Sequence, residues 1–288
     1  MAEKKRLPRK KKKGGADSDY SYRILDRPAF AQLEVSLRPG ERIVSNGGAL
    51  SYVREGVALG KLNKSGTVWD MFKRIFAEQA LFFDSYDGLP GHDDAARTVA
   101  FASHYPGDMM LVRLRVGQRM FASRDAFLAG SPNVKVTGKY NLRGLFAFGQ
   151  DEGFMLPEIV CEAPDPKDGG SPMGCAFIAA YGSFQKHELG AGQTMLVNNG
   201  LFLACQRDVG ASGPPYTVVQ LGRSFLSTVF GGEGLGMRFE GPCTLYTQSR
   251  SFDDLVGLVA ARLPPPPPTI NNNNNGGFNW FGGRLSKN

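Results

Sequence analysis

The sequence predicts an all-β protein built from three copies of one hairpin-bearing unit, with a short helix near the C-terminus. One template recurs three times along the chain. Apolar and polar residues alternate with period two ahead of the template, which is typical of a half-buried strand. Glycine (37 residues) and proline (18 residues) are frequent, which favours many turns and short strands over long helices.

The three copies of the template read LRPGERIVSNGGAL at 37–50, LRVGQRMFASRDAF at 114–127 and LGAGQTMLVNNGLF at 189–202. Each copy places a glycine three residues after a leucine. A Glu or Gln follows the glycine, and an apolar pair comes two residues later. Agreement at this many positions and at a nearly constant spacing predicts an internal repeat.

Each copy of the template is expected to form a β-hairpin. Residues 33–37 alternate between apolar and polar side chains and predict the first strand. Residues 38–41 predict a turn, because proline presets φ at the second position and glycine accepts a positive φ at the third. Gly40, Gly117 and Gly192 are therefore predicted to be structural turn glycines.

Composition divides the chain into a body and two tails. Residues 1–21 are charged or small, and residues 264–288 begin with five prolines and continue into an asparagine run, so both tails are predicted to be disordered. Residues 22–263 are predicted to form one β domain. Its three repeats are expected at about 30–108, 109–183 and 184–263.

The helix is predicted from Ser251 to the proline run. Ser251 suits an N-cap, Asp253 and Asp254 suit the first turn, and Pro264 would stop the helix. One face carries apolar residues at helical spacing: Phe252, Leu255, Val256, Val259 and Leu263. We expect this face to pack on the β body; the alternative is a helix that binds a partner.

Positive charge is concentrated in the N-terminal tail. The formal net charge is +7, and residues 1–13 alone carry eight basic residues against Glu3, so the body is neutral. A neutral body attracts nucleic-acid phosphates weakly. The basic residues, which predict a targeting or anion-binding tail, are Lys4, Lys5, Arg6, Arg9, Lys10, Lys11, Lys12 and Lys13.

The sequence of this tail is compatible with several functions. It resembles a nuclear-import signal, a phosphate-binding arm or a contact for anionic lipid, and simple solvated disorder is equally compatible. It lacks the hydroxyl residues and apolar face of a mitochondrial presequence. No apolar run is long enough to span a bilayer, and no secretion signal precedes the body, so an intracellular protein is expected.

The sequence offers no catalytic constellation. The cysteines form no C-x-x-C pair and the histidines are isolated, so we expect reduced thiols and neither zinc nor another cofactor. The glycines at 231–236 predict a turn rather than a nucleotide loop, because no helix can start after them. Residues 92–94 (His-Asp-Asp) predict an exposed loop rather than a metal site, and His187 a partly buried histidine bonded to backbone. The protein is expected not to be an enzyme.

Several short motifs, in order, resemble those of one family. They are Leu37–Glu41, Gly48–Leu50, Pro106–Asp108, Ala180–Gly182 and Gly231–Gly234. Over about residues 24–250 the chain resembles the mitochondrial-biogenesis (altered inheritance of mitochondria) proteins, which share a domain named after the tryptophan RNA-binding attenuator protein (TRAP-like). The resemblance implies three TRAP-like β-sandwich or β-roll repeats around a pseudo-threefold axis, and it carries no catalytic residues.

Fungal relatives in this family are linked to the mitochondrial inner membrane and to its organising and respiratory complexes. The leading hypothesis is therefore a non-enzymatic scaffold or assembly factor with protein partners. The alternatives are a nucleic-acid-binding protein that uses the basic arm, and a β protein that binds a small ligand between repeats. The resemblance implies a mitochondrial location, whereas the basic tail favours the cytoplasm or nucleus; the sequence leaves compartment and oligomeric state open.

Overall fold

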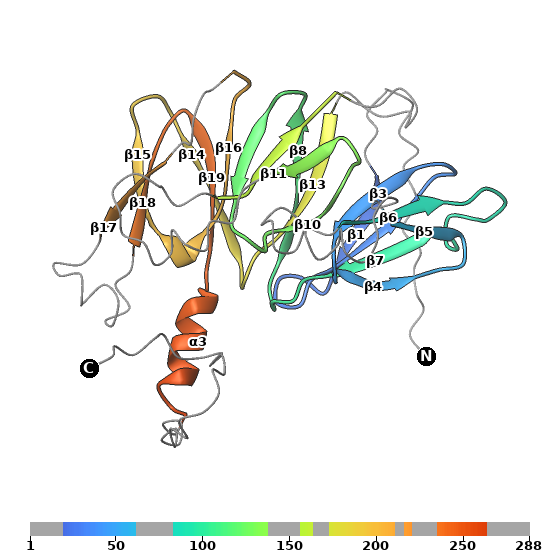
Figure 1. Cartoon of the computed structure of the whole chain (residues 1–288), viewed down its shortest axis with the longest axis horizontal. Coiled ribbons are helices and arrows are strands. Elements are labelled where there is room, and N and C mark those ends of the chain that lie inside the picture. The colour runs from blue at the N-terminus through green and yellow to red at the C-terminus, as the bar shows by residue number, and fades with distance from the viewer. Residues whose placement is uncertain are drawn as a thin grey trace, which may run out of the picture.

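The computed structural model describes residues 20–61, 83–137, 156–163, 173–210, 216–220 and 235–263. Nearly all of the regular structure in these ranges is antiparallel β, which confirms the all-β prediction. The N-terminal strand β1 (Ser21–Leu25) is followed by three units of six described strands each. Figure 1 shows the three units side by side, with one short helix, α3 (Phe252–Ala260), leaving the third.

The strands of the first unit are β2 (Gln32–Ser36), β3 (Arg42–Asn46), β4 (Leu50–Val53), β5 (Val57–Lys61), β6 (Phe83–Gly88) and β7 (Thr98–Ala102). Those of the second unit are β8 (Met109–Arg115), β9 (Arg119–Ala122), β10 (Phe127–Gly130), β11 (Val134–Thr137), β12 (Glu158–Cys161) and β13 (Met173–Ala179). Those of the third unit are β14 (Phe184–Leu189), β15 (Thr194–Asn198), β16 (Phe202–Arg207), β17 (Tyr216–Gln220), β18 (Leu235–Glu240) and β19 (Cys243–Gln248), with a 3-10 turn, η2 (Asn199–Leu201), before β16.

Each unit supplies strand triplets to two different sheets. The order β5-β6-β3 of the first unit continues into β10-β13-β8 of the second, and β11-β12-β9 of the second continues into β16-β19-β14 of the third. Two six-stranded sheets therefore hold the three units together. Two smaller sheets remain at the ends, β1-β2-β7-β4 in the first unit and β15-β18-β17 in the third.

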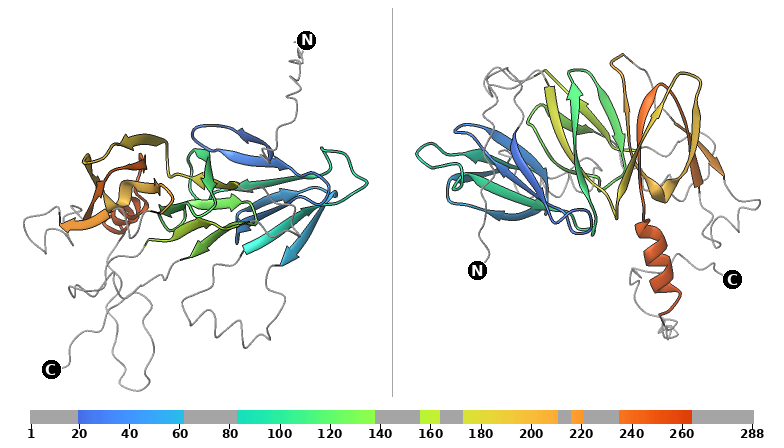
Figure 2. Two further views of the ribbon diagram at one scale, coloured as in Figure 1. Left: turned by 90° about the horizontal axis from the view of Figure 1, so that it is seen from above. Right: turned by 180° about the vertical axis from the view of Figure 1, so that it is seen from behind.

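The described strands do not close into the threefold ring that the sequence suggested. Closure around an axis would require β15 to pair with β4, as β3 pairs with β10, and no such pair forms among the described residues. Because each junction carries a sheet onward into the next unit, the units extend in a row. β4 and β15 lie at opposite ends of that row, and the further views agree (Figures 1 and 2).

The three template turns have the same backbone conformation. Gly40, Gly117 and Gly192 have φ of 75°, 80° and 77°, the left-handed region that favours glycine. Each turn residue after the glycine donates its backbone N–H back to the residue three positions earlier, over 3.0, 2.8 and 3.1 Å. The turns that the template predicts are therefore one structure used three times.

The Glu or Gln of the template has a definite role in these turns. Its side-chain oxygen accepts the backbone N–H of the residue three positions earlier, where the first strand of the hairpin enters the turn. The bonds are Arg38 N–Glu41 Oε2 at 2.8 Å, Arg115 N–Gln118 Oε1 at 3.0 Å and Gly190 N–Gln193 Oε1 at 2.7 Å. The three residues at this position, Glu41, Gln118 and Gln193, have side chains of the same length that end in an oxygen acceptor.

A second irregularity also recurs once per unit. The register of the ladder formed by the third strand of each unit shifts between Leu50 and Tyr52 in β4, between Phe127 and Ala129 in β10, and between Phe202 and Ala204 in β16. Such β-bulges twist a strand and redirect its side chains. The shared position of the shift aligns β4, β10 and β16 residue by residue.

The core runs through the units rather than stopping at each boundary. Strand β13 is buried along most of its length. Phe177 packs with the core of the first unit, whereas Ala176 and Ile178 pack with that of the second. Because successive side chains of a strand point to opposite faces, β13 joins two apolar clusters.

Two expectations about the chain ends need revision. Tyr20 is buried with its hydroxyl 2.5 Å from the carbonyl oxygen of Arg42, and Ser21 begins β1, so ordered structure starts before residue 22. The helix is capped as expected, with Ser251 accepting the backbone N–H of Asp254 at 3.2 Å. Apart from Phe252, its apolar face does not pack on the β body: no residue of α3 is buried, because the helix leaves β19 pointing away from that body (Figure 1).

We predict that Gly192→Ala lowers the free energy of unfolding by about 1 kcal/mol, because an L-residue is strained at this φ. The space around Gly192 is open, so the loss measures backbone conformation alone. Chemical denaturation checks it. Gly257→Ala is the matched control, since Gly257 lies within α3, also in open space but without a positive φ, and should leave stability equal or raised. Equal effects of the two variants would contradict the shared turn geometry.

Candidate functional site

The residues that sequence reasoning considered for metal binding form a structural loop. The Arg97 side chain is buried and donates to the carbonyl oxygen of Leu37 at 2.8 Å and to Asp94 Oδ1 at 2.8 Å. It also donates to the carbonyl oxygen of His92. Asp93 accepts the backbone N–H of Ala96 at 2.7 Å. In the described ranges no group of three or more His, Cys, Asp or Glu residues could hold a metal ion.

The remaining sequence candidates are not gathered into one site. His187 is half-buried, and its Nε2 lies 3.0 Å from Thr247 Oγ1, a side-chain partner rather than the expected backbone one. The turn glycines Gly40, Gly117 and Gly192 lie in three separate units. The basic tail (residues 4–13) and the glycines at 231–236 lie outside the described residues.

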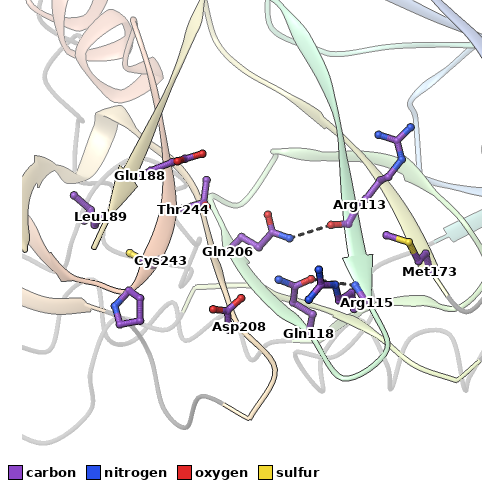
Figure 3. A pocket seen from close by; sticks show the side chains of 11 residues that line it. Arg113, Arg115, Gln118, Met173, Glu188, Leu189, Gln206, Asp208, Cys243 and Thr244 are labelled. Carbon is purple, nitrogen blue, oxygen red and sulfur yellow. Dashed lines mark hydrogen bonds between the residues drawn. The ribbon is translucent and has the colours of Figure 1, made fainter. Parts of the chain in front are cut away.

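A polar pocket of about 490 Å³ opens between the second and third units (Figure 3). Arg113 and Arg115 of β8 line one side, and Gln206 Nε2 donates across to the carbonyl oxygen of Arg113 at 2.9 Å. Glu188 of β14 and Asp208 supply opposite charge. The pocket was missed in the sequence because its lining comes from several strands that only the fold brings together.

A pair of hydrogen-bonded cysteines, Cys205 and Cys243, reaches the third-unit side of this pocket through Cys243. Cys243 lines it, and a hydrogen bond from Cys205, together with the charge of Arg207, lowers the pKa of Cys243 despite its burial. The same hydrogen bond and burial raise the pKa of Cys205. None of the four cysteines Cys161, Cys175, Cys205 and Cys243 is in a disulfide bond, and all four are buried. Cys243 is therefore the thiol of this pair that ionises more readily.

Three aromatic rings hold the base of α3 against the body. The Phe252 ring centroid lies 4.9 Å from that of Tyr105 and 6.5 Å from that of Tyr181. The Tyr105 hydroxyl donates to Asp125 Oδ2 at 2.8 Å. Burial and Asp125 raise the pKa of Tyr105 to about 12, so the hydroxyl stays protonated as the donor at neutral pH. The first helical turn is thus anchored from two neighbouring segments.

Beyond this anchor the apolar face of α3 is open to solvent. The exposed fractions are 41% for Leu255, 49% for Val256 and 52% for Val259. These side chains fall at helical spacing on one face, so together with Phe252 they make a continuous apolar strip. In the ranges that the structure covers, no helix is long and apolar enough to cross a membrane. We call this strip the α3 face.

We predict that Phe252→Ala speeds amide hydrogen exchange in α3 by roughly fivefold, because aromatic contacts of this kind contribute about 1 kcal/mol. The β strands should exchange as before. Val256→Ala, on the same helix but outside the aromatic anchor, is the control and should not speed exchange. Unchanged exchange in Phe252→Ala would show that the rings do not hold the helix.

Comparison with known proteins places the chain in a family. No curated protein matches it. The crystal structure of Protein SPYM3_0169 from Streptococcus pyogenes is similar, with a TM-score of 0.62 and 20% identity over 85% of this chain and 100% of that chain; this likeness shows a shared fold. Residues 22–250 match the family described as Mitochondrial biogenesis AIM24. Since the match spans most of the chain, the protein belongs to the AIM24 mitochondrial biogenesis family.

Proposed function

We propose that this protein is a non-enzymatic scaffold or assembly factor that binds a protein partner through the α3 face. The observation that carries the proposal is a capped helix, anchored at its base, whose apolar residues are exposed. Exposed apolar patches mark interaction sites, because leaving them in water is unfavourable. The family supports a partner within mitochondrial biogenesis.

The chemistry of α3 favours one kind of partner. Apolar residues at helical spacing fit a hydrophobic groove, the usual mode by which an amphipathic helix binds a protein. Asp253 and Asp254 in the first turn favour a basic rim on that groove. The same two carboxylates disfavour an anionic lipid surface, which attracts helices rich in Lys and Arg.

The locations of the exposed apolar side chains and of the charged side chains support a non-enzymatic role. Five of the twelve exposed large apolar side chains that the structure describes lie on α3, outside the pocket, whose lining is mostly polar. Asp93 and Asp94, which sequence reasoning considered for a metal site, hold a loop through the Ala96 backbone and the Arg97 side chain. The feature of the described residues that supports the proposal is therefore an exposed surface for binding a partner, and not a pair of groups suited to acid–base catalysis.

We predict that Leu255→Asp reduces partner recovery at least tenfold. Truncation of a central interface residue commonly costs more than 1 kcal/mol, and a buried charge costs more. Tagged full-length protein would be isolated from its native cells after cross-linking and compared by quantitative mass spectrometry. Leu59→Asp is the matched control, because Leu59 is a 62% exposed leucine on β5. Recovery of the protein alone, or equal recovery from both variants, would contradict the proposal.

A second candidate function is the binding of a small ligand in the pocket between the second and third units. The arginines and carboxylates that line this pocket favour a ligand that carries both charges, such as a free amino acid. We predict that such a ligand raises the melting temperature of the full chain by a few degrees, since it binds only the folded state. A thermal-shift screen of amino acids checks this. The rise should disappear in Arg115→Gln, and absence of any rise would remove this candidate.

A further inference from the structure

The internal repeat identifies two sheet edges that lack the neighbour their counterparts have. β3 pairs with β6 and β10, and β9 pairs with β12 and β16. β15 holds the same place in the third unit, yet among described strands it pairs with β18 alone. At the other end β4 corresponds to β10 and β16, and among described strands it pairs with β7 alone.

The free edge of β15 leaves apolar side chains more exposed than their counterparts in the other two units, where Phe121, the counterpart of Leu196, is half-buried. Met195 and Leu196 align with Ile43 and Val44 in the first unit. Ile43 is 0% and Val44 6% exposed, whereas Leu196 is 50% exposed and Met195 is half-buried. Among the described strands, β15 has no neighbour in the place that β10 takes beside β3. An exposed apolar edge strand is a ready template for pairing with another strand.

The free edge of β4 shows the same contrast. Ser51, at the bulge, is exposed, whereas its counterparts Leu128 and Leu203 are 4% and 1% exposed. The Ser51 hydroxyl accepts a hydrogen bond from Gln32 at 2.6 Å. A polar residue here keeps the edge soluble when unpaired, which suits reversible docking rather than a permanent interface.

We propose that β15 of one copy of this chain pairs with β4 of a second copy, so that copies associate head to tail. The occupant is a second copy because the two edges lie at opposite ends of one molecule (Figure 1). The inference is independent of the function proposed for α3. Such a contact joins two different surfaces of the same protein. Successive copies form a closed ring where the rotation between neighbours brings the last copy back to the first, and a filament where it does not.

The two junctions inside the chain fix the register of this contact. Ala129 pairs with Ser45 in one junction, and Ala204 pairs with Ala122 in the other. The equivalent pair in the proposed contact is Tyr52 with Val197. One position further along, Val53 faces Leu196, which would cover the exposed leucine with an apolar side chain.

We predict a directional cross-link between two variants of the full chain that each add one cysteine, Val53→Cys and Leu196→Cys. Directly paired residues of antiparallel strands have Cα atoms about 4.5–5.5 Å apart, which suits a disulfide. The native cysteines are buried. After mixing and mild oxidation, covalent dimer should form in the mixture and at least tenfold less in either variant alone.

Leu59→Cys mixed with Val53→Cys is the control, because Leu59 lies on an edge strand that the repeat does not match to β4. Equal dimer in this control, or no excess dimer in the first mixture, would overturn the proposal. Dimer from Leu196→Cys alone would show symmetric pairing of like edges and would overturn it too.

Light scattering on chromatographed protein gives an independent check without new cysteines. The mass of the unaltered chain should rise above 31.3 kDa with concentration, and Leu196→Lys should hold it at 31.3 kDa, whereas Leu59→Lys should not. A constant mass of 31.3 kDa for the unaltered chain at high concentration would overturn the proposal.

Discussion

Main-chain pairing between neighbouring units is the constraint on which the rest of this structure depends. At β3–β10 and again at β9–β16, one unit completes the sheet of the next. Strand edges left in water expose unpaired N–H and C=O groups, so these junctions satisfy backbone and bury apolar side chains together. The sharing of β13 between two apolar clusters follows from the same arrangement. The units are therefore parts of one body, and their ends carry the only junction surfaces among the described strands that stay open.

Local features could be predicted from the sequence because neighbouring residues determine them. The turns at Gly40, Gly117 and Gly192 follow from glycine at one position and a Glu or Gln after it, and the cap at Ser251 follows from its hydroxyl. The family resemblance recognised from ordered motifs was correct over residues 22–250. Its TRAP-like description and the disordered tails remain predictions.

The features that could not be predicted from the sequence depend on contacts between residues far apart in the chain. Periodicity shows that α3 has an apolar face but not what covers it, so the expected packing on the β body was wrong for all of that face except Phe252. A repeat predicts like units but not whether the last meets the first, because that depends on angles accumulated over two junctions. The pocket between units is lined from distant strands, and no spacing along the chain indicates it.

Amide hydrogen exchange on the full chain in dilute solution tests the central claim most directly. If junction pairing holds the units, amides of β3, β9, β10 and β16 exchange slowly, since these strands are bonded on both sides, whereas those of β4 and β15 exchange faster. Equal protection of β15 and β3 under dilute conditions would contradict the account, because it would mean that the third unit is closed by a partner within the same chain.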